Sequence, residues 1–409
     1  MMRPIHSFFL IYFIFLNVSL SFGKTVCKPT SAGNSSIDDV PAIHQALSMC
    51  GNGGIIIIPA GQIFTIRSPL NFQDCHSCDF QIEGTLKVFD DLEYWQEKKA
   101  FFVFTNVKDG TFHSLTGQGL IDGSGQKFWD YFAKNQTYQR PLLIHITNSS
   151  NVVFNKFSLK NPAFWFIFVT DNSRNVTFAN LTLSAISTSS SLPKNTDGFD
   201  TGDCSYVTIS DIHVINGDDC VSFKNGSNYV TVQNLTCIGS HGLSVGSLGG
   251  DPGEYFVKNV YISNVTMINS AFATRIKFYP GGPSHGTVVI RNVTYENIFV
   301  DNCDYAFRLD NCYESDPTMC KTNPSAAKLY DINFINLRGR TSKTYDPVVA
   351  NIECPPLGIC NLVFKEWHVL SLSGNSTVLC SYYEHPSGIK CTNKEFYETE
   401  RFRLTHRVK

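Results

Sequence analysis

Charged residues are scarce in this 409-residue chain, and lysine and arginine never form a run longer than a pair. Only 17% of the residues are charged, and the formal net charge is −2. A nucleic-acid partner requires a basic patch or stripe, so this class of partner is not predicted. Beyond the N-terminus, no segment approaches the about 20 consecutive apolar residues of a membrane-spanning helix, so we expect no membrane partner.

Metal-ligand spacings are also lacking, although the chain contains 14 cysteines. Cys75 and Cys78 form one C-x-x-C motif, but no second pair with ligand-like spacing accompanies it. In a secreted chain, this usage favours disulfides over a zinc site. We therefore predict disulfide bonds and no bound metal.

The N-terminus has the organisation of a secretory signal peptide. Arg3 precedes a mostly apolar stretch at 7–22, and Ser21 and Gly23 are small residues near the expected cleavage site. We predict a signal peptide at 1–23, a single domain at 24–409 and a secreted protein. Ten Asn-x-Ser/Thr sequons are candidate glycan sites in such a protein: Asn34, Asn135, Asn148, Asn175, Asn180, Asn225, Asn234, Asn264, Asn292 and Asn375.

Short strand-like segments separated by turns recur along most of the chain. Residues 36–50 have helical periodicity behind a Ser/Asp start, and Ile55 to Ile58 form a buried strand closed by Pro59. Alternating segments then recur at 151–159, 175–183, 206–209, 229–232, 259–262 and 286–290. This spacing predicts a parallel β-helix of about ten coils, with a short capping helix at its head.

The corners of this solenoid are marked by asparagine and glycine. Asparagine tolerates the left-handed conformation and bonds to its own backbone, so it suits a tight corner. The glycine-rich segment at 117–125 has no phosphate-loop lysine, so we interpret it as a corner rather than a nucleotide loop.

Carboxylates, one histidine and two cations are concentrated between residues 195 and 277. The segments are Asn195-Thr196-Asp197, Gly217-Asp218-Asp219, Ser240-His241-Gly242 and Arg275-Ile276-Lys277. Asp197 and Asp219 are 22 residues apart, as are Asp219 and His241. If each step is one coil, these residues stack about 4.8 Å apart on one outer face, with Asp218 beside them. The plainer alternative for Asp218 and Asp219 is a turn whose backbone N–H groups satisfy both aspartates.

These four segments, in this order, resemble glycoside hydrolase family 28, the polygalacturonases and their relatives. The resemblance covers about residues 38–391. It implies a right-handed β-helix, hydrolysis of α-1,4-linked galacturonan in pectin with inversion, and no cofactor. It also favours three disulfides, Cys220–Cys237, Cys354–Cys360 and Cys380–Cys391. We expect a monomer.

The resemblance assigns roles to the acidic residues. Asp218 is expected to protonate the glycosidic oxygen as the general acid, while Asp197 and Asp219 hold and deprotonate the attacking water. Crowding raises the pKa of at least one of the three, and His241 is expected to orient the acid and tune its proton. Carboxylates one coil apart would indicate a retaining pair by separation alone. The family is inverting, and we follow the family.

Substrate-binding residues are predicted on both sides of these carboxylates. Arg275 and Lys277 flank one apolar residue, so both point outward from a strand, where they suit the carboxylate of a uronic acid. An ordinary solvated surface is the alternative. Asn195 is a further candidate, and Tyr313 matches a downstream tyrosine of the family, although the residues around it differ.

The mode of action is predicted from two segments, 161–165 and 240–249, which resemble the exo-acting branch of the family. The 34 residues from His241 to Arg275 exceed the preceding steps of 22 residues. We expect the excess to leave the stack as a loop near 249–253 and to close one end of the groove. The prediction is an exopolygalacturonase that releases galacturonic acid. The alternatives are an endopolygalacturonase, a xylogalacturonan or rhamnogalacturonan hydrolase, or a β-helix that binds pectin without cleaving it.

Overall fold

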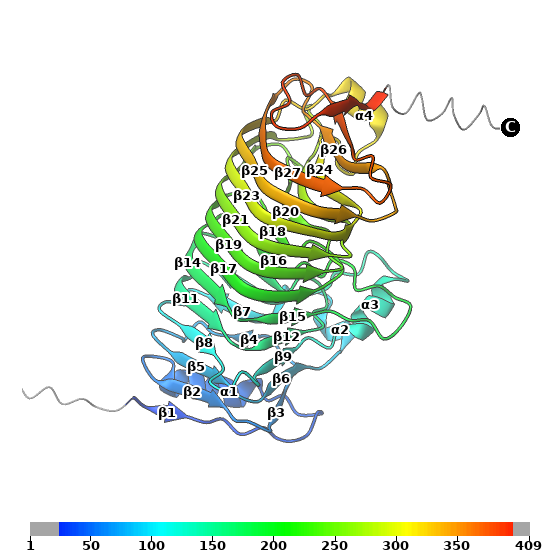
Figure 1. Cartoon of the computed structure of the whole chain (residues 1–409). Helices are drawn as coiled ribbons and strands as arrows, with labels where there is room; N and C mark the ends of the chain where they lie inside the picture. The colour runs from blue at the N-terminus through cyan, green and yellow to red at the C-terminus, as the bar shows by residue number, and fades with distance from the viewer. Residues whose placement is uncertain (1–23, 396–409) are drawn as a thin grey trace, which may run out of the picture.

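Stacked coils form one long solenoid in the computed structural model of the chain, in which residues 24–395 are described (Figure 1). The architecture is a right-handed parallel β-helix, as predicted. The predicted signal peptide at 1–23 lies outside the described residues. Within the described range, no helix is long and apolar enough to span a membrane.

A twelve-stranded parallel sheet, here called sheet B, carries the candidate site. Twelve strands are somewhat more than the ten coils expected from the sequence. Along the stack the strands are β4 (Leu70–Asn71), β7 (Ala100–Thr105), β10 (Leu142–Thr147), β13 (Ile167–Thr170), β16 (Phe199–Thr201), β18 (Val221–Phe223), β20 (Leu243–Leu248), β22 (Phe272–Phe278), β24 (Tyr305–Asp310), β26 (Val348–Glu353), β28 (Thr377–Ser381) and β29 (Cys391–Asn393).

A seventeen-stranded sheet, here called sheet A, forms the rest of the wall. Early coils contribute two short strands each, whereas later coils contribute one long strand. The strands are β1 (Val26–Cys27), β2 (Ile55–Ile58), β3 (Ile63–Ile66), β5 (Asp79–Ile82), β6 (Thr85–Val88), β8 (Thr111–His113), β9 (Leu120–Asp122), β11 (Ser150–Asn155), β12 (Ser158–Lys160), β14 (Ser173–Ala179), β15 (Thr182–Ser184), β17 (Cys204–Ile215), β19 (Ser227–Ile238), β21 (Glu254–Ile268), β23 (Thr287–Cys303), β25 (Lys328–Thr341) and β27 (Ile359–Leu370).

Asparagines occupy the corners, as the sequence predicts, and they form columns that hold successive coils in register. Asn234, Asn264, Asn297 and Asn336 all have positive φ in the middle of long strands of sheet A. Each side-chain amide donates to the residue one coil earlier, beginning with Asn234 to Asp211 at 3.0 Å and ending with Asn336 to Asn297 at 2.7 Å. Every long strand therefore bends at the same point, which keeps successive coils aligned.

The interior is filled by inward-facing aliphatic and aromatic side chains. Phe112, Phe154 and Phe178 stack on successive coils, with ring centroids 5.2 and 5.1 Å apart. Equivalent rings face one another because parallel pairing places like positions side by side. The same pairing aligns the outward-facing residues of sheet B.

The predicted cap is α1 (Val40–Cys50), which begins four residues later than the periodic segment. The other helices between residues 24 and 395 are α2 (Leu92–Trp95), α3 (Gln126–Phe132) and α4 (Pro317–Thr322). The disulfides of the described residues are Cys27–Cys50, Cys75–Cys78, Cys220–Cys237, Cys312–Cys320, Cys354–Cys360 and Cys380–Cys391. All three predicted pairs are confirmed, and the C-x-x-C motif forms a disulfide. Two buried cysteines, Cys204 and Cys303, are unpaired.

Two sequence interpretations need correction. The glycine-rich segment at 117–125 contains strand β9 as well as corners, and a Cβ on Gly119 would lie 2.1 Å from the Ile82 carbonyl oxygen. The excess residues after His241 do not all leave the stack. Strand β21 has 15 residues against 12 in β19, because it begins earlier and pairs with β23 from Glu254 onward. A longer strand of sheet A therefore absorbs part of the excess.

Candidate active site

The strand register of sheet B brings the predicted residues together. Phe199 pairs with Val221, and Val221 pairs with Leu243. Asp197, Asp219 and His241 each lie two residues before these partners, so they occupy one column at the turns that enter sheet B. The 22-residue spacing in the sequence is therefore one coil, as expected.

Three carboxylates converge at this column. One oxygen from each of Asp197, Asp218 and Asp219 lies within 4.8 Å of the others. Asp197 and Asp219 are buried, whereas the Asp218 side chain retains 15% exposure. Asp218 is therefore the carboxylate of the three that is most accessible from outside.

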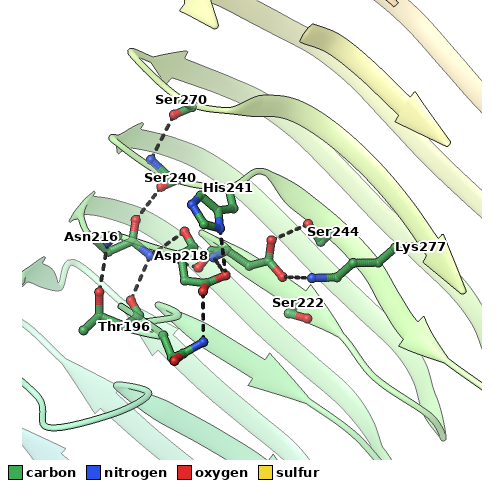
Figure 2. Close-up of polar contacts among 12 residues, drawn as sticks. Thr196, Asn216, Asp218, Ser222, Ser240, His241, Ser244, Ser270 and Lys277 are labelled. Carbon is green, nitrogen blue, oxygen red and sulfur yellow. Dashed lines mark hydrogen bonds and ion pairs between the residues drawn. The ribbon is translucent and has the colours of Figure 1, made fainter. Parts of the chain in front are cut away.

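A buried asparagine bends the backbone so that adjacent aspartates share one site. Figure 2 shows Asn216 between Thr196 and Ser240. Its Nδ2 donates at 2.9 Å to the backbone carbonyls of Thr196, Asp218 and Asp219, and its Oδ1 accepts from Ser240 Oγ at 2.5 Å. In a regular strand, neighbouring side chains point to opposite faces. The Asn216 contacts hold an irregular turn in which Asp218 and Asp219 both reach the cluster.

Asp219 is held in a fully enclosed ion pair. Lys277 Nζ donates to Asp219 Oδ2 at 2.9 Å, and Ser244 Oγ donates to Oδ1 at 2.6 Å (Figure 2). Asp219 has no exposed surface, and Lys277 is 4% exposed. The lysine points to the same face as Arg275, as predicted, but its ammonium group is committed to Asp219.

His241 and Asp218 form a close pair at the edge of the cluster. His241 Nδ1 lies 3.2 Å from Asp218 Oδ1. This hydrogen bond raises the pKa of His241 above its ordinary value of 6.5, although burial opposes it. Burial alone would raise the pKa of Asp218, but the hydrogen bond and charge of His241, with the charge of Lys277, lower it to about 2. In the free protein, the proton of this pair therefore resides mainly on His241.

Asp197 has the opposite electrostatic environment. Burial, followed by the negative charges of Asp200 and Asp218, holds the pKa of Asp197 well above its ordinary value. Crowding was expected to raise one pKa in the cluster, and Asp197 is the residue that shows this. Like charges in a small enclosed space cannot all remain ionised at no cost.

Asp200 is a fourth carboxylate that the sequence interpretation missed. It has no exposed surface, and its Oδ1 lies 3.3 Å from Lys224 Nζ. Burial raises its pKa to about 7, against the opposing effect of Lys224. Its register partners Ser222, Ser244 and Arg275 place it in the outward row of sheet B. The sequence pattern could have identified Asp200. Phe199 is apolar and faces inward, so the next residue on the strand faces outward.

Arg140 is a second missed residue, and no motif surrounds it. One guanidinium nitrogen donates to Asn195 Oδ1 at 2.7 Å, and the other donates to the Lys194 carbonyl at 2.7 Å. The amide nitrogen of Asn195 in turn donates to Asp218 Oδ2 at 3.3 Å. Arg140 thus fixes which end of the Asn195 amide faces Asp218. The predicted substrate-binding residue Asn195 lies against the acid itself.

Arg275 is a cation beside the carboxylate cluster that has no acidic partner. Among residues 24–395 it forms no ion pair, and its buried Nε has no hydrogen-bond partner. Its guanidinium carbon lies 4.4 Å from the Phe272 ring centroid and 5.2 Å from that of Tyr313. Tyr313, which the sequence offered as a substrate-binding candidate, therefore sits beside Arg275.

The cluster also has the donors for a cation, because three carboxylates converge. Two of them already face a positive charge, Asp219 on Lys277 and Asp218 on His241. Convergent acidic groups alone do not establish a metal site.

A carboxylate cluster, an Asp–His pair and a guanidinium with no acidic partner among the described residues lie together on one face of a parallel β-helix. This arrangement is suited to hydrolysing an acidic polysaccharide. Comparison with known proteins specifies the family. The family model described as "Glycosyl hydrolases family 28" matches residues 50–391. The chain belongs to glycoside hydrolase family 28, and it is a pectin-degrading hydrolase.

Two named relatives extend this result. The chain is 47% identical to endo-xylogalacturonan hydrolase A of Aspergillus tubingensis over 370 residues, which cover 90% of this chain and 91% of the relative. The crystal structure of the Aspergillus tubingensis endo-xylogalacturonan hydrolase has a TM-score of 0.89, with 90% of this chain and 99% of that chain covered. A polygalacturonase from Erwinia carotovora ssp. carotovora has a TM-score of 0.65 at 19% identity over 92% of this chain and 100% of that chain, and it shares the fold.

The pairing of His241 with Asp218 leads to a prediction about how activity depends on pH. Because the pKa of His241 is raised in the folded protein, the proton is present below its ordinary value of 6.5 and is lost as the pH rises through the raised value. We expect kcat/KM to fall on an alkaline limb above pH 6.5. In His241→Gln, the limb should move to lower pH and the rate should fall, since only a carboxyl group can then carry the proton. A limb at the same pH in both proteins would show that the pair does not supply the proton.

Proposed function

We propose that this protein is a secreted endo-acting hydrolase of xylogalacturonan, a galacturonan backbone with neutral xylose branches. The relative at 47% identity, matched along nine-tenths of both chains, is an endo-xylogalacturonan hydrolase. This was one of the alternatives left open by the sequence. Exo action, the first prediction from the sequence, is replaced here by endo action.

The unpaired guanidinium of Arg275 is the observation that carries the choice of an acidic backbone. It lies beside the carboxylate cluster without an acidic partner among the described residues. A galacturonate carboxylate would satisfy both its charge and its planar donor geometry. Lys277 contributes less to this contact than expected, since it is 4% exposed and paired with Asp219.

The proposed reaction divides the work between exposed and buried carboxylates. Asp218 protonates the departing glycosidic oxygen and receives the proton that His241 holds in the free protein. Asp197 and Asp219 hold the water that attacks the anomeric carbon, and the reaction inverts the configuration. Arg140, through Asn195, keeps Asp218 directed at the cleft.

The loop expected to favour exo action lies away from His241. The loop follows β20, whereas His241 precedes β20, so the loop begins at the end of this strand that is opposite the histidine. Asp251 in this loop donates its N–H to the Tyr255 hydroxyl at 3.3 Å, and a Cβ on Gly250 would lie 3.2 Å from the Tyr279 ring, so the loop contacts both β21 and the segment after β22. Six disulfides among the described residues suit an oxidising compartment and so support secretion. We also propose that residues 24–409 form one catalytic domain.

The substrate and mode of action are tested together by initial rates on xylogalacturonan and on unbranched polygalacturonate. We expect a higher kcat/KM on xylogalacturonan, with a rapid loss of viscosity relative to reducing ends and with mixed oligomers as the first products. Monomeric galacturonic acid as the first product, with slow loss of viscosity, would show exo action. A higher kcat/KM on unbranched polygalacturonate would contradict the proposed substrate.

Asp218→Asn tests the general acid. An amide cannot donate the proton that the leaving oxygen requires, so kcat should fall by about 10²- to 10⁴-fold on xylogalacturonan. Circular dichroism should be unchanged, since Asn216 holds the turn through backbone carbonyls. Asp301→Asn, which changes an exposed aspartate on sheet A, is the matched control and should keep full activity. A loss of less than tenfold in Asp218→Asn would assign the proton to another group.

A further inference from the structure

A groove begins at His241 and runs away from the catalytic column along the turns that enter the later strands of sheet B. It has a volume of about 410 Å³, and its lining includes His241, Ser270, Asn302, Asp304, Lys343 and Thr344. This volume lies within the range of about 300–1,000 Å³ that is usual for small-molecule sites. His241 therefore borders two spaces, the catalytic cluster and this groove.

The groove lies opposite the cationic side of the cleft. Ser270 and Ala271 immediately precede β22, so the groove follows the strand starts. The Tyr313 N–H donates to the carbonyl of Phe278 at 3.2 Å, which places Tyr313 at the end of the same strand. Arg275 lies between the start and the end of β22. The uronate-binding cation and the groove are thus separated along the strand direction.

This arrangement matches the geometry of a branched galacturonan. In a 1,4-linked galacturonate ring, the carboxylate at C5 and the hydroxyl groups at C2 and C3 project from opposite edges of the ring. A ring whose carboxylate turns toward Arg275 and Tyr313 presents its C2–C3 edge to the strand starts. A sugar attached at O3 would then be directed into the groove.

The groove suits a neutral sugar rather than a second uronate. Beyond His241 at its mouth, the groove contains one acidic and one basic residue, Asp304 and Lys343, whose charges balance. Asp304 Oδ1 accepts from Ser342 Oγ at 2.6 Å, and Ser342 Oγ can accept from the Thr344 hydroxyl, which lies 3.0 Å away. Hydroxyl and amide groups predominate along the rest of the lining. Such groups recognise sugar hydroxyls without demanding a charge.

An aromatic row follows the boundary between the groove and the cleft. Phe272 and Tyr305 are register partners on adjacent strands, with ring centroids 6.1 Å apart, and Tyr305 stacks on Tyr345 at 4.5 Å. Tyr345 is 44% exposed and directly follows Thr344 in the groove. An exposed ring at this position offers an apolar surface to the C–H face of a sugar.

We infer that this groove is a subsite for the neutral pentose branch of a galacturonan substrate, carried on a backbone sugar next to the cleavage point. Lys343, Thr344 and Asn302 contact the branch hydroxyls, and Tyr345 borders its apolar face. The inference rests on the proposed function, because an enzyme of unbranched chains has no branch to bind. It assigns the preference for branched chains to residues outside the catalytic cluster.

Filling the groove tests the inference. In Lys343→Trp, an indole at the exposed rim would occupy the branch position, so the ratio of kcat/KM on xylogalacturonan to that on unbranched polygalacturonate should fall about tenfold. Thr344→Val keeps the side-chain size but removes the hydroxyl, and it should lower the ratio by a smaller factor. Lys365→Trp introduces the same side chain at an exposed position of β27 in sheet A and should leave the ratio unchanged.

The outcomes separate this inference from the proposed function. If the wild-type enzyme prefers xylogalacturonan but neither groove variant changes the ratio, the groove is not the branch subsite and the proposed function stands. If both variants lower the two kcat/KM values equally, the groove supports the active site without recognising a branch, and the inference is overturned. If the wild-type enzyme does not cleave xylogalacturonan, the proposed function and the inference both fail.

Discussion

The parallel hydrogen-bonded register of sheet B is the constraint on which the site depends. Phe199, Val221 and Leu243 pair in register, and this pairing stacks Asp197, Asp219 and His241 at the strand entrances. No single coil contains enough groups for hydrolysis. Adjacent coils lie about 4.8 Å apart, so three of them bring the three carboxylates within 4.8 Å of one another and His241 into contact with Asp218. Asn216, which bonds the carbonyls of two coils, secures the irregular turn within this regular stack.

Close stacking also decides where protons and charges reside. Asp219 is neutralised by Lys277 inside the wall, Asp218 is paired with His241, and burial raises the pKa of Asp197. In the proposed reaction, cleavage begins when the glycosidic oxygen approaches Asp218. The proton then moves from His241 to Asp218 and on to this oxygen. Arg275, which has no acidic partner among the described residues, is available to the carboxylate of the sugar. Lys277 thus balances a carboxylate inside the wall, whereas Arg275 is free to bind the substrate in the proposed reaction.

The sequence predicted those features that repeat locally, and it missed those that depend on packing between distant segments. Equal 22-residue steps revealed the column of Asp197, Asp219 and His241, because parallel pairing converts equal spacing into contact. The excess length between His241 and Arg275 was predicted to form a loop. Part of it instead lengthens strand β21 of sheet A. Arg140 lies 55 residues before Asn195, and no local pattern connects them. The sequence also could not show where the proton of the His241–Asp218 pair resides, because this depends on burial and on charges from several coils.

The most direct test of the account is the anomeric configuration of the first reducing ends released from xylogalacturonan, followed by proton NMR before mutarotation. The central claim is that Asp197 and Asp219, from neighbouring coils, act on a bound water while Asp218 protonates the leaving oxygen. It predicts that the α-linkage yields the β-anomer first. A first product with the α-anomer would mean that one aspartate forms a covalent intermediate, as the 4.8 Å separation alone would suggest, and would contradict the account.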